Sequence, residues 1–590
     1  MLGGIDVKAQ SGLTDVQLLQ KLKWLPGQGT KTVRKAAVGG DAAAFVLASR
    51  SRLQPFADRL RKRLGRNRLS LLSGLALPPD SLAARFTNSD GQTADPDLGE
   101  SLCQWLALQP LTGTNLPPCD SVLILQLLLD PPIDTQVETW LRLWRLVSTT
   151  VSPSKSRTKP GILAETIATA TRFAGALLFE PLKGSKSLQH DSREALERTL
   201  LEMTDSDGTP AAAVVENLRA WLATFVRASE FSRAFKSPLF AGATAERYRL
   251  FIQRAIELSN GGHFAFEGQP TVDTDALLRI AAKSAGWSAQ TKVGALARGR
   301  KVKGGKKKGK QRVDPAVQSD WARFAYCRSD HTSNADLLAI SHSEATPNIS
   351  LNCFGAAVLS GPWRTTLTVR EKPVAATGKW DCTCWHSDED GDYIELRWSR
   401  QRLHIDRQIF LSRTHRFAIL MDSATGRRDS ALSVDLSLRI APNVMNQADF
   451  VSREWRLHTD TVPVRAFPVS LDFDRVHNAL GDFTVEEDTI RYAVTGKQAV
   501  QAALVLDWHP KRRTADTDWQ SLTVTEDRQA LASAQATAFR LRVGKHQLVS
   551  YRNMDGSEEL RAVMGHHSDH ETIIARFGKK GLEPLVLVDP

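Results

Sequence analysis

Before residue 290, apolar residues recur at the three- and four-residue spacing of amphipathic helices. Thr135-Gln-Val-Glu138 is a capping-box pattern, and it predicts a helix start just before such a stripe. A second helix is expected from Thr209-Pro210, a third over about 243–258 before Asn260-Gly261-Gly262, and a fourth from Thr274-Asp275. Helices of about 12–18 residues that are joined by short loops favour packing as antiparallel hairpins. This half is therefore predicted to be all-α.

After Asp314-Pro315 apolar residues recur at every second position, in short runs separated by turn residues, which is typical of β-strands. A long series of such segments predicts an antiparallel β-sandwich. We therefore expect an all-α domain over 1–290, a basic Lys/Gly linker over 291–315 and a β-sandwich domain over 316–590. The expected strands include Tyr393–Trp398, Arg402–Leu411, Phe417–Met421, Val434–Ile440, Ala502–Trp508, Ala538–Val543 and Leu585–Val588.

The composition is that of an ordinary globular chain, with 42% apolar and 24% charged residues. These fractions exclude collagen-like, fully disordered and disulfide-scaffold proteins. No apolar run approaches the roughly 20 residues that span a bilayer, so no membrane span is predicted. The first 25 residues lack the pattern of a secretory signal, and six scattered cysteines fit a reducing compartment, so a cytoplasmic location is expected.

The net charge of +12 is concentrated in one segment. Lys292–Arg312 contains ten Lys or Arg residues and no acidic residue, which leaves +2 for the other 569 positions. The segment is interpreted as a flexible linker. It could also bind a polyanion, or nucleic acid, through counterion release. Because it lacks aromatic residues for base stacking, any binding of nucleic acid would be nonspecific.

Twelve of the fourteen histidines lie after residue 315. In the loop 566–571, His567 and His570 could hold a divalent metal with Asp569, although exposed histidines of a polar loop explain the pattern as well. Cys382 and Cys384, two apart in a strand, could share an ion or simply pack one sheet face. No other cofactor is predicted, because nucleotide-binding glycine loops and a G-x-S-x-G elbow are absent from the sequence.

Six segments follow one another along the chain in a recognisable order. They are Leu200–Thr209 with its Asp207-Gly208, Ser259–Phe266, Asp336-Leu-Leu, Leu351–Gly355, Leu359–Trp363 and His404–Asp422. Their order resembles that of the heparinase II/III-like polysaccharide lyases, in which an incomplete (α/α) toroid precedes antiparallel β-sheets and which are often periplasmic or secreted. The resemblance covers about residues 200–430.

The resemblance implies β-elimination at a uronate of an acidic polysaccharide. Such a site neutralises the uronate carboxylate, removes the C5 proton with a His or Tyr, and protonates the leaving oxygen. The resemblance suggests His342 as base, Tyr248 as acid, and Asn217 or His263 as the group that neutralises the carboxylate. Arg328 and His331 are alternatives for that carboxylate contact.

The sequence also departs from the family after Asp207-Gly208. Where the family usually has an acidic residue and a Tyr-His pair, this chain has Pro210–Asn217. Tyr248 also lies on an apolar helical stripe that is typical of a core, and His342 could be a turn residue. The alternatives to an active lyase are therefore a catalytically degenerate member, a non-catalytic protein that binds a polyanion, and an intracellular interaction protein of the same architecture.

Overall fold

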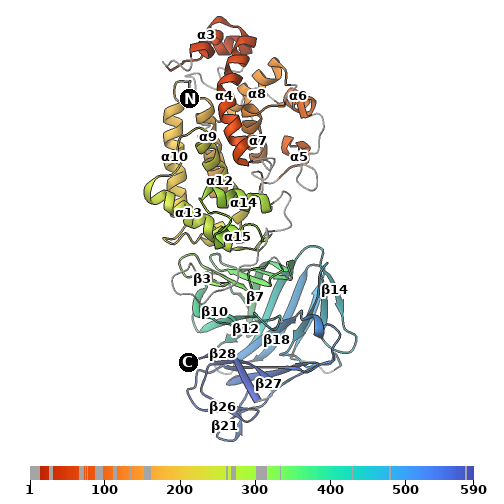
Figure 1. The fold of residues 1–590 in the computed structure, drawn as a ribbon. Coiled ribbons are helices and arrows are strands. Elements are labelled where there is room, and N and C mark those ends of the chain that lie inside the picture. The colour runs from red at the N-terminus through yellow and green to blue at the C-terminus, as the bar shows by residue number, and fades with distance from the viewer. Residues whose placement is uncertain are drawn as a thin grey trace. The chain divides into compact units, whose positions relative to one another are not determined.

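The computed structural model falls into two compact units, with helices in the first half of the chain and strands in the second (Figure 1). The first unit comprises 1–210, 217–264 and 268–300, and the second comprises 211–216, 265–267 and 301–590. The structure describes residues 13–589 except 26–30, 65–71, 73–74, 76, 87–97, 110–115, 133–134, 152–160, 261–262, 268–273, 300–314, 333, 428–429, 477–479 and 579–580.

The first unit is built from helices, as predicted. Its core is formed by their apolar faces, with α9 packing against both α10 and α12. A two-residue pairing of β1 (Ser259–Asn260) with β2 (His263–Phe264) follows α13. The helices are α2 (Asp15–Lys21), α3 (Lys31–Gly39), α4 (Ala42–Leu64), α5 (Leu82–Phe86), α6 (Leu98–Leu108), α7 (Pro118–Leu129), α8 (Val137–Thr150), α9 (Ile162–Leu178), α10 (Ser185–Glu202), α12 (Leu218–Ala234), α13 (Gly242–Glu257), α14 (Thr274–Ser284) and α15 (Lys292–Leu296).

The helices expected over about 243–258 and from Thr274 are observed as α13 and α14. The capping box predicted at Thr135 is not formed. Helix α8 has Gln136 as its N-cap, with no side-chain cap. The Thr135 hydroxyl instead donates to the carbonyl of Pro132, at 2.8 Å. Helix α15 lies in the first part of the segment expected to be a linker, while residues 300–314 lie outside the described part of the chain.

The single helix expected from Thr209 is also wrong, because the chain breaks into α11 (Ala212–Val215) and α12. Residues 211–216 belong to the second unit. The Ala212 amide donates to the carbonyl of Ala322 at 2.9 Å, and the Asn348 amide donates to the Glu216 carboxylate at 3.2 Å. These bonds hold the α11 segment in the second unit, and the helix is interrupted at Asn217, whose φ of −134° and ψ of 35° are not helical.

The second unit contains two long antiparallel ladders, joined by the pairing of Lys497 with Ala499. The central ladder runs β9 (Asp381–Ser387), β10 (Gly391–Arg400), β11 (Leu403–Ser412), β12 (Phe417–Thr425), β19 (Ala499–Asp507), β16 (Pro463–Pro468), β15 (Trp455–His458) and β14 (Met445–Ala448). The flanking ladder runs β3 (Val317–Ser319), β4 (Phe324–Arg328), β5 (Leu337–Ser341), β6 (Asn348–Cys353), β7 (Ala356–Val369), β13 (Ala431–Ile440), β18 (Thr489–Lys497) and β17 (Gly481–Glu486), with β8 (Lys372–Ala375) also on β7.

Two smaller sheets complete the second unit. The C-terminal sheet contains β20 (Thr517–Ser521), β23 (Ala536–Val543), β24 (His546–Asn553), β27 (Thr572–Gly578) and β28 (Gly581–Val588), paired in that order. The remaining sheet contains β22 (Gln529–Ala530), β21 (Val524–Glu526), β25 (Arg561–Val563) and β26 (His566–Ser568).

The central ladder is buried on both faces. One face shares a core with the flanking ladder, through residues such as Ile394 and Leu504. The other face shares a core with the C-terminal sheet, through residues such as Phe410 and Trp519. Strand β19 is therefore buried at every position, whereas β13 in the flanking ladder alternates between buried and more exposed positions. The predicted sandwich is confirmed, with a third layer stacked on it.

Cys382 and Cys384 do not pack one face, contrary to the expectation for residues two apart. Cys382 packs against the core shared with the flanking ladder, and Cys384 against the core shared with the C-terminal sheet. The reason is a β-bulge: Leu396 pairs with Cys382 and Glu395 with Cys384, so Thr383 is unpaired. One extra residue reverses the alternation of the strand.

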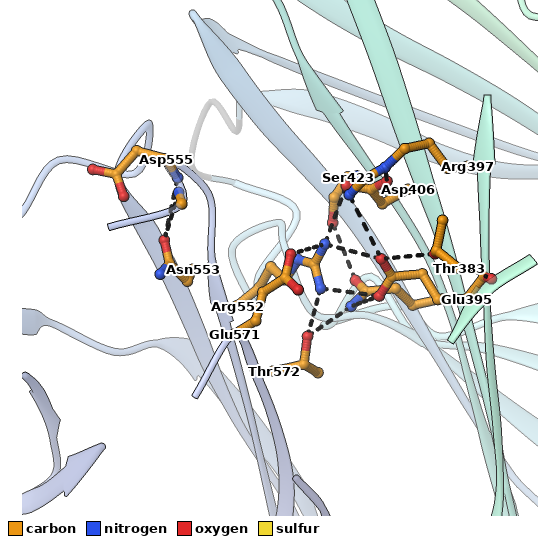
Figure 2. Close-up of polar contacts among 12 residues, drawn as sticks. Thr383, Glu395, Arg397, Asp406, Ser423, Arg552, Asn553, Asp555, Glu571 and Thr572 are labelled. Carbon is orange, nitrogen blue, oxygen red and sulfur yellow. Dashed lines mark hydrogen bonds and ion pairs between the residues drawn. The ribbon is translucent and has the colours of Figure 1, made fainter. Parts of the chain in front are cut away.

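A buried polar cluster lies between the central ladder and the C-terminal sheet, and we call it the Arg552 cluster (Figure 2). The Arg552 guanidinium contacts the Glu395 carboxylate at 3.0 and 3.2 Å and the Asp406 carboxylate at 3.1 Å. It also contacts the Glu571 carboxylate at 2.9 Å and donates to the Thr572 hydroxyl at 2.7 Å. Arg552, Glu395 and Asp406 are almost fully buried. Each buried charge thus has partners, and the cluster joins two layers.

Candidate functional site around His342

His342 directly follows β5, and it is held in place by two hydrogen bonds. Its backbone amide donates to the carbonyl of Arg323 at 2.9 Å. Its Nδ1 lies 3.0 Å from the carbonyl oxygen of Trp380. The side chain is only 2% exposed. The imidazole is therefore fixed in orientation by two neighbouring backbone segments.

The hydrogen bond to Trp380 defines the chemistry of the ring. A carbonyl oxygen only accepts, so Nδ1 carries the proton and Nε2 carries the lone pair. Nε2 is buried and has no hydrogen-bond partner among the described residues. Burial lowers the pKa of His342 below its ordinary value of 6.5. The ring is therefore neutral near pH 7, with one basic nitrogen that the fold does not use.

The Trp380 segment is itself anchored in the core. The Arg407 guanidinium lies between two indole rings, 4.4 Å from the Trp380 centroid and 4.0 Å from that of Trp363. The same guanidinium is paired with Asp422, with Nε 2.8 Å from the carboxylate. All four side chains are at most 1% exposed. This packing gives the carbonyl that orients His342 a rigid support.

Several charged and amide side chains of the second unit lie near His342. The Asp381 carboxylate is 2.8 Å from Lys379 Nζ and 3.8 Å from the Arg323 guanidinium. Arg323 lies beside His342, because its carbonyl accepts the His342 amide, and Asp381 directly follows Trp380, whose carbonyl lies 3.0 Å from His342 Nδ1. On the next strand, Asn348 pairs with Ser341, the residue before His342. These groups supply cations and an amide beside an unused base.

Arg323 and Asn348 were not among the site residues expected from the sequence. Arg323 lies in a turn with a φ of +56°, just before β4, and Asn348 begins β6. The pairing of Phe324 with Ser341, and of Ser341 with Asn348, brings both residues next to the end of β5. This proximity depends on strand register, which no local motif in the sequence encodes.

Tyr248, the expected acid, lies on α13 inside the first unit. Its side chain is 4% exposed, and its hydroxyl is 2.7 Å from the Ser284 hydroxyl, which donates in turn to that of Ser229. Burial raises the pKa of Tyr248 to about 12. These contacts favour a packing role, which was the alternative interpretation of its helical stripe.

Asn217 and His263, the residues expected to neutralise the carboxylate, also belong to the first unit. Asn217 is exposed and is the N-cap residue of α12, although its side chain makes no capping hydrogen bond. His263 begins β2 and pairs with Asn260 through the backbone. Asn217 thus has an amide available to solvent.

Arg328 and His331 lie at the other end of β5 from His342. Arg328 ends β4 and pairs with Leu337, the first residue of β5, whereas His342 follows its last residue. Five strand residues separate these ends, a distance of about 17 Å. The structure therefore does not bring Arg328 together with His342.

The histidine loop 566–571 lies on β26 and the turn after it. The His566 ring packs edge-on against Phe577, and His570 Nδ1 is 3.0 Å from the Asp569 carboxylate. Among the residues that the structure describes, no group of three or more His, Cys, Asp or Glu side chains is arranged to hold a metal ion. Within the same residues, no helix is long and apolar enough to cross a bilayer.

Comparison with known proteins places the fold. No protein-family model matches the sequence. No curated protein matches it either. Among solved structures, heparinase III matches with a TM-score of 0.55 and 11% identity, over 92% of this chain and 97% of that one. A mutant of heparan sulfate lyase HepC from Pedobacter heparinus matches with a TM-score of 0.52 and 11% identity, over 92% of this chain and 99% of that one. The chain thus has the helical toroid and antiparallel sheets of these lyases.

Proposed function

We propose that the protein is a polysaccharide lyase that acts on an acidic, uronate-containing polysaccharide by β-elimination. The observation that carries this proposal is the neutral, oriented imidazole of His342 with its unused Nε2. The fold supports it, because the two similar structures named above are a heparinase and a heparan sulfate lyase. Removal of a weakly acidic carbon-bound proton requires a base of this kind, placed beside groups that stabilise the enolate-like intermediate.

The proposed reaction assigns two roles to groups of the second unit. Arg323 and the second N–H of the Asn348 amide, whose first N–H is donated to Glu216, neutralise the uronate carboxylate, while His342 Nε2 removes the C5 proton. The C5–H electrons then form the C4–C5 double bond as the C4–O bond breaks. The imidazolium of His342 returns the proton to the leaving oxygen, since the hydroxyl of Tyr248 is buried against Ser284. Nε2 is covered in the free chain, so substrate binding has to uncover it.

The pH dependence of the reaction follows from the environment of His342. The base must be unprotonated, and burial lowers its pKa below 6.5, so protonation sets in only at lower pH. We expect kcat/KM on a uronate polymer to stay on its plateau down through pH 6.5 and to fall only below it. The measurement is initial rate against pH, and an acidic limb above 6.5 would contradict His342 as the base.

The first test of the proposal is a panel assay. Purified protein is incubated with heparan sulfate, chondroitin sulfate, hyaluronan, alginate and polygalacturonate, and the unsaturated uronate product is followed by its ultraviolet absorbance. Formation of this chromophore on at least one polymer supports the proposal. If no polymer yields it while the protein remains folded, the lyase function is rejected.

A second candidate function is non-catalytic binding of a polyanion, which the basic segment 300–312 favours. This segment contains eight Lys or Arg residues and no acidic residue. Replacing all eight with glutamine keeps the length, and should sharply reduce the slope of log affinity for heparin against log salt. The measurement is heparin binding over a salt series.

The control for this experiment is the same number of Lys or Arg residues replaced elsewhere in the chain, away from this segment. An unchanged slope in the 300–312 variant would leave the segment as a linker. A duplex DNA titrated in parallel tests the nucleic-acid alternative, which requires a similar loss of slope on DNA.

A further inference from the structure

A cavity of about 360 Å³ opens on the second unit, away from His342. Its walls combine apolar and polar groups. Phe354, Pro510 and the segment Thr461-Val462-Pro463 line it, together with Asn334 and Arg513. Small-molecule sites commonly have volumes of about 300–1,000 Å³ and combine apolar walls with a few polar groups. The cavity is therefore large enough for one or two sugar rings.

Phe354 is held rigidly at this cavity. It forms the β6–β7 turn with Gly355, and both have positive φ, +49° and +80°. Asn or Gly normally occupies the first position of such a turn, because a bulky side chain is disfavoured there. The Asp336 carboxylate accepts the Phe354 amide at 3.0 Å, and the Arg416 guanidinium lies 3.8 Å from the ring centroid. The fold thus maintains an aromatic ring where turn chemistry alone would disfavour one.

Arg513 is the cation of the cavity, and it is exposed. Neighbouring acids are already paired: Asp507 with Arg512 at 2.7 Å, and Asp336 with Arg416 at 3.1 Å. No ion pair to Arg513 is found among the described residues. Its guanidinium therefore keeps its planar set of donors for a carboxylate or sulfate, which it can bind in a bidentate manner.

We infer that this cavity is a binding site for an anionic sugar unit, a uronate or a sulfated pyranose. The C–H face of the sugar packs on Phe354 and the prolines, its anionic group binds Arg513, and its hydroxyls bond to Asn334 and Thr461. The site is separate from the proposed base, because Asp336 and His342 flank opposite ends of β5, about 20 Å apart. It does not depend on lyase activity.

The test is titration of the full chain with glucuronic acid, glucose 6-sulfate and glucose, followed by ligand-observed NMR. The Arg513→Ala variant should weaken binding of both anionic sugars about tenfold, since it removes the cation and its paired donors from the cavity. Lys511→Ala is the matched control, because Lys511 is exposed, carries the same charge, and does not line the cavity. It should change affinity less than twofold.

One further variant tests the aromatic wall of the cavity. Phe354→Gly removes the ring at a position whose positive φ suits glycine, and it should weaken binding while the chain stays folded. Absence of saturable binding, equal loss in the Arg513 and Lys511 variants, or equal affinity for glucose would each overturn the inference.

Discussion

Replacement of Arg552 with leucine should lower the free energy of unfolding of the second unit by about 3–5 kcal/mol. The substitution removes the Arg552 guanidinium from the buried Glu395 carboxylate and leaves Asp406 with Arg397 alone, and these two carboxylate side chains are 3% and 6% exposed. A buried charge that loses its partner costs more than the pair itself contributed. The measurement is chemical denaturation, with hydrogen exchange of β24 and β27 to localise the loss.

Arg397→Leu is the matched control for this prediction. Arg397 contacts the same Asp406 carboxylate at 2.5 Å, but its side chain is 41% exposed. We expect a loss below about 1 kcal/mol, because water replaces the partner. Adding Glu395→Gln to Arg552→Leu should recover part of the stability, since it removes one unpaired charge. Equal losses of unfolding free energy in the Arg552→Leu and Arg397→Leu variants would contradict the prediction, because they would show that the burial of the arginine does not determine the loss.

Replacement of His342 with glutamine should reduce the proposed lyase activity by at least about 100-fold, the usual contribution of general base catalysis. Glutamine keeps a donor for the Trp380 carbonyl but has no basic nitrogen. The measurement is kcat/KM on whichever uronate polymer gives the unsaturated product.

The control is Ser343→Ala, at the neighbouring exposed position. It should retain activity, and both variants should show the thermal unfolding of the parent chain. Activity close to that of the parent in a folded His342→Gln protein would remove His342 from the reaction and leave it as a structural histidine. This outcome would not affect the inference about the Phe354 cavity.

The fold class could be predicted because the spacing of apolar residues within each helix and strand is visible in the sequence of that segment alone. The helical stripe of α13 and the alternation of β13 record, residue by residue, which side faces a core. The capping box predicted at Thr135 is wrong because the Thr135 hydroxyl donates to the carbonyl of Pro132. The helix predicted from Thr209 is wrong because the chain leaves the helical conformation at Asn217. The third layer was not foreseen, because an apolar run such as β19 does not reveal how many sheets cover it.

The candidate site was only partly within reach of the sequence. The family resemblance pointed to His342, but the supporting groups Arg323 and Asn348 come together only through strand register. Cys382 and Cys384 show the same limit on a smaller scale. One unpaired residue, Thr383, reverses which face each thiol occupies, and a bulge of this kind has no reliable sequence signal.

The Arg552 cluster also has a consequence for the chain during its synthesis. Glu395 precedes Arg552 by 157 residues. At about 5–20 residues per second, a ribosome adds the arginine about 8–30 s after the glutamate. During that interval the nascent central ladder presents carboxylates on the face that the C-terminal sheet later covers. We expect these hydrated charges to oppose stacking on that face until the strand that carries Arg552 has been translated, because covering an unpaired carboxylate is costly.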